Sequence, residues 1–107
     1  MAETEPRQMY LVMQTPGPSW DPELERREQV LWDEHAAYMD GLAAAGTVVV
    51  AGPAGDGDEV LVLYDAPDED AVRAILENDP WTNVVLQIDS IVPWSIWVDG
   101  RGASADR

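Results

Sequence analysis

The chain has 107 residues, enough for one small domain, and 46% of them are hydrophobic, so it can bury a core of its own. With 21 Asp and Glu against six Arg, the formal net charge is −15, which disfavours binding to nucleic acid or to an anionic membrane surface. No apolar run is long enough to cross a bilayer, no secretory leader follows Met1 and cysteine is absent, so we expect a soluble, cytoplasmic protein.

The first half of the chain predicts one strand and one main helix. Gln8–Thr15 is rich in strand-forming residues, and the three prolines of residues 16–22 interrupt regular structure after it. Asp21 followed by Pro22 is typical of a helix start. The helix therefore either runs unbroken from there to Ala45, or follows a short early turn and begins near Arg27. Gly46 is expected to end it.

This helix has an apolar stripe that predicts its buried face. The stripe residues are spaced by four, three and four positions, as expected for one side of an α-helix. They are Leu31, His35, Tyr38 and Leu42, with Trp32 and Met39 beside them.

The second half of the chain predicts three further strands and a second helix. A glycine-rich turn joins two of the strands, and the acidic residues after Pro67 suit the first turn of the helix. The expected strands are 47–51, 59–64 and 84–91, the turn is 52–58, and the helix runs from Pro67 to the stop at 78–80. Residues 93–98 continue either as an extended tail or as an edge strand.

The order β-α-β-β-α-β predicts an α+β, ferredoxin-like fold, with a four-stranded antiparallel sheet and both helices on one face. We expect the domain to span residues 8–98, with flexible tails at 1–7 and 99–107. The first three strands are apolar on both faces, for example at Leu11 and Val12 of the first strand. Because one face would otherwise expose a large apolar surface, a second copy is the simplest cover, and the sequence predicts a homodimer.

His35 is the candidate catalytic residue. It is the only histidine in a chain without cysteine or lysine, so an imidazole working with a carboxylate is the natural catalyst. Asp79 ends the second helix, which neighbours the first in this fold, and Trp32 and Trp81 would supply dry walls. A core histidine that is satisfied by one hydrogen bond, with Asp79 as a turn residue, explains the same pattern.

Other candidate sites have simpler explanations. Asp56, Asp58 and Glu59 lie in a glycine-rich segment, but they lack the spacing of a calcium loop and fit a tight hairpin turn. Arg26 and Arg27 either steer an anionic substrate toward a pocket or form a solvated helix face. No cofactor-binding or metal-binding motif is present, so we expect neither a cofactor nor a metal.

Four short segments, in this order and spacing, resemble the YciI-like (YCII-related) proteins of the dimeric α/β-barrel superfamily. The resemblance covers about Met9 to Trp97, and the longer first connection is similar to that of one subgroup. The segments are His35–Met39, Ala51–Pro53, Asp79–Trp81 and Ile91–Trp94.

The resemblance implies a ferredoxin-like dimer whose sheets face each other and a histidine–aspartate pair at His35 and Asp79. His35 would act as general base or acid and Asp79 would orient it, in a lyase, isomerase or dehalogenase reaction on a small organic substrate. The expected substrate pocket is lined by Trp32, Tyr38, Pro53 and Trp81. The alternative is a non-catalytic dimeric domain that binds a small ligand or a partner protein.

Overall fold

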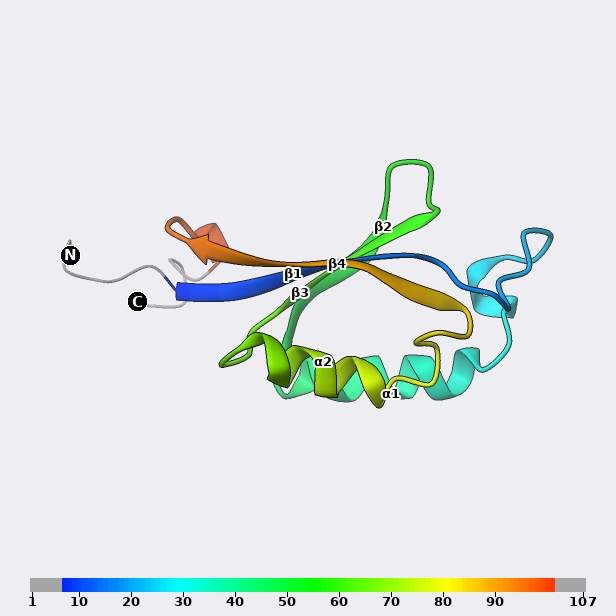
Figure 1. Cartoon of the computed structure of the whole chain (residues 1–107), viewed down its shortest axis with the longest axis horizontal. Helices are drawn as coiled ribbons and strands as arrows, with labels where there is room; N and C mark the ends of the chain where they lie inside the picture. Colours follow the sequence, from blue (N-terminus) through cyan, green and yellow to red (C-terminus); the bar gives the residue numbers. More distant parts are fainter. Residues whose placement is uncertain (1–6, 102–107) are drawn as a thin grey trace.

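Two helices cover one face of a four-stranded antiparallel sheet in the computed structural model, which describes residues 7–101 (Figure 1). The strand order is β2-β3-β1-β4. This is the α+β, ferredoxin-like fold that the sequence predicts. The strands are β1 (Arg7–Pro16), β2 (Val48–Ala54), β3 (Glu59–Tyr64) and β4 (Leu86–Ile96). The two α-helices are α1 (Trp32–Ala44) and α2 (Glu69–Glu77), and a short 3-10 turn, η1 (Arg26–Glu28), precedes α1.

The central strand β1 fixes the register of the sheet. Tyr10 of β1 pairs with Tyr64 of β3 on one side and with Pro93 of β4 on the other. The β1–β4 ladder shifts register between Met13 and Gln14, which marks an irregularity of the β-bulge type. Both edge strands contain a proline, Pro53 in β2 and Pro93 in β4, as is typical of strands that pair on one side only.

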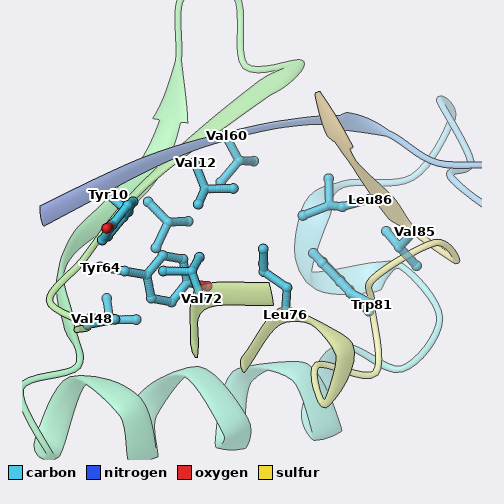
Figure 2. Packing of buried hydrophobic residues seen from close by; sticks show 12 residues of the cluster. Tyr10, Val12, Val48, Val60, Tyr64, Val72, Leu76, Trp81, Val85 and Leu86 are labelled. Carbon is cyan, nitrogen blue, oxygen red and sulfur yellow. The ribbon is translucent and has the colours of Figure 1, made fainter. Parts of the chain in front are cut away.

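The core lies between the inner face of the sheet and the helices (Figure 2). Alternate residues of β1, Tyr10 and Val12, point into it and meet Val72 and Leu76 of α2. Each fully buried aliphatic side chain contributes about 1.5–3 kcal/mol relative to an exposed one. The cluster also includes Val48, Val60, Val62, Tyr64, Ala66, Trp81, Val85 and Leu86.

The segment before α1 corrects the predicted helix start. Of the two alternatives, the structure has the short early turn, η1, but α1 begins only at Trp32 rather than near Arg27. The reason is that Leu31 adopts a left-handed conformation with φ of 64°. Gln29 is buried, and its amide accepts from the Asp21 N–H and donates to the Asp21 carbonyl. The Asp21 carboxylate accepts from the Glu23 N–H, so Asp21 caps a turn and not the helix.

Gly46 ends α1 as expected, with a φ of 82°. Its N–H donates to the Ala43 carbonyl, and the Thr47 N–H donates to the Leu42 carbonyl, which is the Schellman arrangement. The predicted stripe is only partly confirmed. Leu31 precedes the helix and is exposed, whereas Trp32, Met39 and Leu42 pack against the core.

The start of α2 also differs from the prediction by two residues. The helix begins at Glu69, because the Asp68 side chain accepts from the Ala71 N–H at 2.8 Å and so acts as the N-cap, which leaves Pro67 outside the helix. Asn78 caps the other end, and Pro80 lies just beyond it.

Strand ends were predicted less well than strand identities. β4 begins at Leu86 rather than at Val84, because the Trp81 carbonyl holds residues 84–86 in a turn. It continues to Ile96, so the segment 93–98 is largely an extension of this edge strand. β2 runs three residues further than expected, to Ala54.

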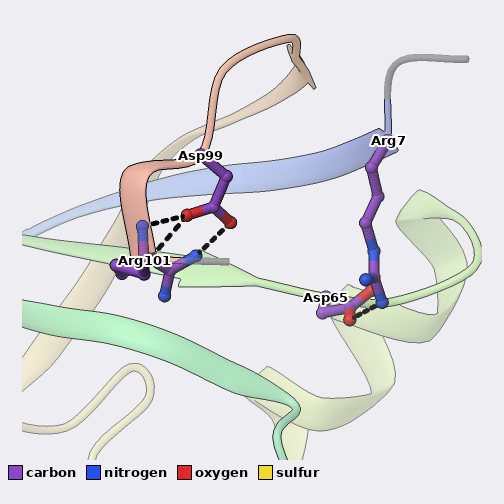
Figure 3. A network of polar contacts seen from close by, with 4 residues as sticks. All are labelled: Arg7, Asp65, Asp99 and Arg101. Carbon is purple, nitrogen blue, oxygen red and sulfur yellow. Dashed lines mark hydrogen bonds and ion pairs between the residues drawn. The ribbon is translucent and has the colours of Figure 1, made fainter. Parts of the chain in front are cut away.

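β1 begins at Arg7, inside the expected tail, and the rest of that tail and residues 102–107 lie outside the described part. Arg7 forms an ion pair with Asp65, at the end of β3, and Asp99 pairs with Arg101 at 2.7 Å after β4 (Figure 3). Such exposed pairs contribute at most about 1 kcal/mol each.

Candidate functional site

The fold brings His35 and Asp79 into direct contact. His35 lies in the first turn of α1, and Asp79 lies two residues beyond the end of α2. The distance between His35 Nδ1 and Asp79 Oδ1 is 2.8 Å, and the two side chains are 12% and 3% exposed. The pair is therefore nearly enclosed, where charge interactions are stronger than in water.

Asp79 is held in place by its own backbone and by its neighbour. Its N–H donates to the Leu76 carbonyl at 3.1 Å, which continues the end of α2. Its Oδ1 also accepts from the backbone N–H of Trp81 at 3.0 Å. Because a carboxylate oxygen can only accept a hydrogen bond, this contact selects the imidazole tautomer that carries its proton on Nδ1. The second ring nitrogen, Nε2, has no hydrogen-bond partner among residues 7–101.

Trp81 forms one wall of the site. Its ring stacks on the His35 imidazole, with centroids 4.0 Å apart and planes 5° from parallel. The indole N–H donates to the Val30 carbonyl at 2.7 Å, which fixes the ring against the loop before α1. Trp32 packs at a tilt against both rings, at 5.9 Å from His35 and 5.5 Å from Trp81.

The Asp79 carboxylate helps to raise the pKa of two tyrosines. Burial, and secondarily the Asp79 carboxylate, raise the pKa of Tyr64 well above its usual value. The same two causes, in the same order, raise the pKa of Tyr38. Both phenols therefore stay protonated at neutral pH and do not act as bases there.

A hollow of about 210 Å³ lies beside the His35 ring, between α1 and the inner face of the sheet. Three of the four expected pocket residues, Trp32, Pro53 and Trp81, line it together with His35. Tyr38 lies outside the lining, and its hydroxyl donates to the Ile75 carbonyl at 2.7 Å, which ties α1 to α2. The remaining lining residues are Gln14, Arg26, Met39, Ala51, Gly52, Val60, Val62 and Leu86.

Two polar lining residues were not predicted as part of the pocket. Gln14 follows Tyr10 and Val12 at the strand period, and a polar residue in this buried series was the signal. For Arg26 the sequence allows either a place near a pocket or a solvated helix face. The structure places it in η1, lining the hollow and partly buried. No sequence periodicity indicates that Arg26 lines the hollow, because η1 is an isolated turn.

No three His, Cys, Asp or Glu residues gather as a possible metal site in the part of the chain that the structure describes. In the hairpin between β2 and β3, Asp56 Oδ1 accepts from the Asp58 N–H at 3.1 Å, and Gly55 and Gly57 have positive φ, as in a tight turn. No helix among residues 7–101 is long and apolar enough to cross a membrane.

These features define a class: an α+β protein of ferredoxin-like fold, with a nearly enclosed histidine–aspartate pair beside a small hollow. Residues 9–95 match the model of the YCII-related domain, and the chain belongs to this family. A search of curated proteins returned no match to the chain.

Proposed function

We propose that His35 and Asp79 perform acid–base chemistry on a small organic molecule bound in the adjacent hollow. His35 is the general base or acid, and Asp79 orients it. The observation that supports this proposal best is the 2.8 Å contact of two nearly enclosed groups at the wall of a hollow. Trp32, Pro53 and Trp81 form the apolar part of the substrate pocket.

The chemistry follows from the tautomer. With the proton on Nδ1 donated to Asp79, the neutral imidazole presents the lone pair of Nε2 as a base. When Nε2 takes a proton from the substrate, the imidazolium is stabilised by the adjacent carboxylate, and the proton can be returned to another atom of the substrate. A proton that returns to another atom of the same substrate gives an isomerase. A proton that leaves together with a departing group, such as a halide, gives a lyase or an eliminating dehalogenase, and none of these reactions needs a cofactor. We propose the cytoplasm as the place where the protein carries out this reaction.

A second candidate function is binding of a small ligand without turnover. The hollow itself supports this alternative, because a mostly apolar lining can hold a small ligand without any proton transfer. The two functions differ in whether protons are exchanged at Nε2.

The tautomer of His35 tests the first proposal. Because this is the only histidine, its ring nitrogens give the only imidazole signals in a ¹⁵N NMR spectrum. We expect the Nδ1–H tautomer in the wild type and a mixture in Asp79→Asn, since the amide lacks the charge that selects it. Asp33→Asn, which removes an exposed charge from the same turn of α1, is the matched control and leaves the tautomer unchanged.

Proton exchange separates the two functions. In D₂O, the wild type is expected to accelerate deuterium incorporation into small carbonyl compounds such as pyruvate and cyclohexanone, and His35→Gln to lose this acceleration. If the wild-type His35 ring carries its proton on Nε2, the result contradicts the proposal that Asp79 orients His35 through Nδ1. If His35 has the Nδ1–H tautomer but the protein accelerates deuterium incorporation into none of the carbonyl compounds tested, the result favours the binding function.

We further propose that the outer face of the sheet is covered by a second copy, as the family resemblance implies. Figure 1 shows both helices on the opposite face, and no described element covers this one. Leu11, Leu63 and Trp94 help to line a shallow apolar depression of about 420 Å³ there. Isolated proteins rarely leave apolar patches of this kind in contact with water.

A further inference from the structure

Two residues that line the hollow each have a buried nitrogen atom without a hydrogen-bond partner. Gln14 Nε2 and Arg26 Nη1 are both shielded from solvent, and no described residue accepts from either. Buried donors are almost always paired in native proteins, because an unpaired one has lost its water and gained nothing. Two such donors on residues that line one hollow suit a ligand with an atom that accepts from them.

Gln14 is placed by an irregularity in the sheet. It lies at the register shift of the β1–β4 ladder, where a bulge can redirect a side chain. The residue is 3% exposed and follows the apolar Tyr10 and Val12 on the inner face of β1. Its amide is therefore a polar group in an apolar wall, and it lines the hollow that His35 also lines.

Arg26 is held from two sides, so that its guanidinium stays at the hollow. Its Nη2 donates to the Gly57 carbonyl in the β2–β3 hairpin, and the guanidinium carbon lies 5.3 Å from the centre of the Trp20 ring. Among residues 7–101 it has no carboxylate partner, although the chain contains 21 acidic residues. A cation kept free of carboxylates in so acidic a protein is available to an external anion.

We propose that the hollow binds a small organic anion whose carboxylate accepts from Arg26 and Gln14. The apolar body of the ligand lies against Trp32 and Trp81, which places it beside His35. A planar guanidinium and an amide are the donors that suit a carboxylate, and the remaining lining is mostly apolar. The volume of about 210 Å³ is smaller than pockets for drug-sized ligands, so the ligand is small. This inference rests on the proposed function, because it names the substrate class of the same hollow.

The test is a binding titration with acetate and benzoate as probes and with acetamide and benzamide as their uncharged counterparts. The His35 ring signals report on occupancy of the hollow. We expect saturable binding of at least one carboxylate and binding of its amide that is about ten-fold weaker or more. Equal binding of acid and amide, or no saturable shift with either carboxylate at millimolar concentration, overturns the proposal.

The two adjacent arginines provide a matched pair of variants. Arg26→Gln and Arg27→Gln remove the same charge from the same turn, but Arg27 is exposed and lies outside the lining. Arg26→Gln is expected to weaken carboxylate binding about ten-fold or more, and Arg27→Gln less than about two-fold. Equal losses in the two variants would show that only the overall charge matters, which contradicts the proposal.

Gln14→Met distinguishes a ligand-binding role from a structural one. Replacing an unpaired buried amide with an apolar side chain of similar size is expected to raise the melting temperature of the unliganded protein while carboxylate binding weakens. A lower melting temperature with unchanged binding would show that Gln14 is structural and overturn its assignment.

The binding experiments and the proton-exchange experiment test the anion site and the acid–base function separately. Carboxylate binding that depends on Arg26, with no proton exchange, retains the anion site and rejects acid–base catalysis. Proton exchange that depends on His35, without preference for acids over amides, retains the catalysis and rejects the anion site.

Discussion

Asp79 connects the site to the core through several neighbours. Its one carboxylate accepts from His35 and from the Trp81 backbone, and its charge contributes to the raised pKa of Tyr64. A charge that is buried in this way is tolerated because donors surround it. Replacing it therefore changes the tautomer of His35, the turn after α2 and the ionisation of a core phenol together.

The raised pKa of Tyr64 predicts a loss of stability in alkali. Above about pH 10 the unfolded chain releases the phenolic proton while the folded protein keeps it, so the free energy of unfolding falls by up to about 1.4 kcal/mol per pH unit. Below that pH the phenol is neutral in both states and has no effect. Tyr64→Phe should make the alkaline decline shallower than in the wild type, measured by urea unfolding at a series of pH values. The chain has no lysine, so no ammonium group titrates in this window. Parallel curves for the two proteins would contradict the prediction.

At the residue scale, the sequence indicated part of the site. His35 was found because it is the sole histidine, and Asp79 because the fold makes the two helices neighbours. Gln14 and Arg26 were not assigned to the pocket, since their roles depend on a strand irregularity and on a loop conformation. Neither feature has a periodic signal, and both are decided by tertiary packing.

At the element scale, the long first connection is fastened to the end of the sheet. The Gly17 N–H donates to the Val85 carbonyl, and the Ser19 N–H donates to the Val84 carbonyl, each at 2.7 Å. This anchor lies between β1 and the loop that carries Arg26. Arg26 is the residue of this connection that lines the hollow, so the anchored connection contributes that side chain to its wall.

Two glycines in different elements should respond to alanine with opposite signs. A Cβ on Gly17 would lie 2.8 Å from the Val84 carbonyl oxygen, so Gly17→Ala is expected to cost about 1–3 kcal/mol of unfolding free energy. Gly41 is exposed within α1 and a Cβ there meets nothing within 4 Å, so Gly41→Ala should gain about 0.5–1 kcal/mol. Urea unfolding followed by tryptophan fluorescence measures both. A Gly17→Ala variant as stable as the wild type would show that the segment around Gly17 shifts without cost, which contradicts the prediction.

Element order was predicted correctly, whereas helix starts were not. Strand and helix periodicities identify which segments are regular, but the start of a helix depends on a single cap. Asp68 in place of Pro67, and the left-handed Leu31 before α1, are local decisions of this kind.

At the scale of the whole molecule, the proposed dimer makes the outer sheet face an interface. Val50 and Val30 are both 53% exposed, but Val50 lies on this face and Val30 precedes α1. Val50→Lys is expected to convert a dimer into monomers at micromolar concentration, because it buries an unpaired charge. Val30→Lys should leave the assembly intact. Light scattering measures both masses, and a monomeric wild type would reject the dimer.

The prolines in the two edge strands restrict how copies of this protein can associate. Pro53 in β2 and Pro93 in β4 each remove a backbone donor from an open border of the sheet. Growth by adding strands side by side, the route to fibrils, is therefore obstructed at both borders. The proposed association through the apolar outer face of the sheet does not use these borders, so the prolines leave it unobstructed.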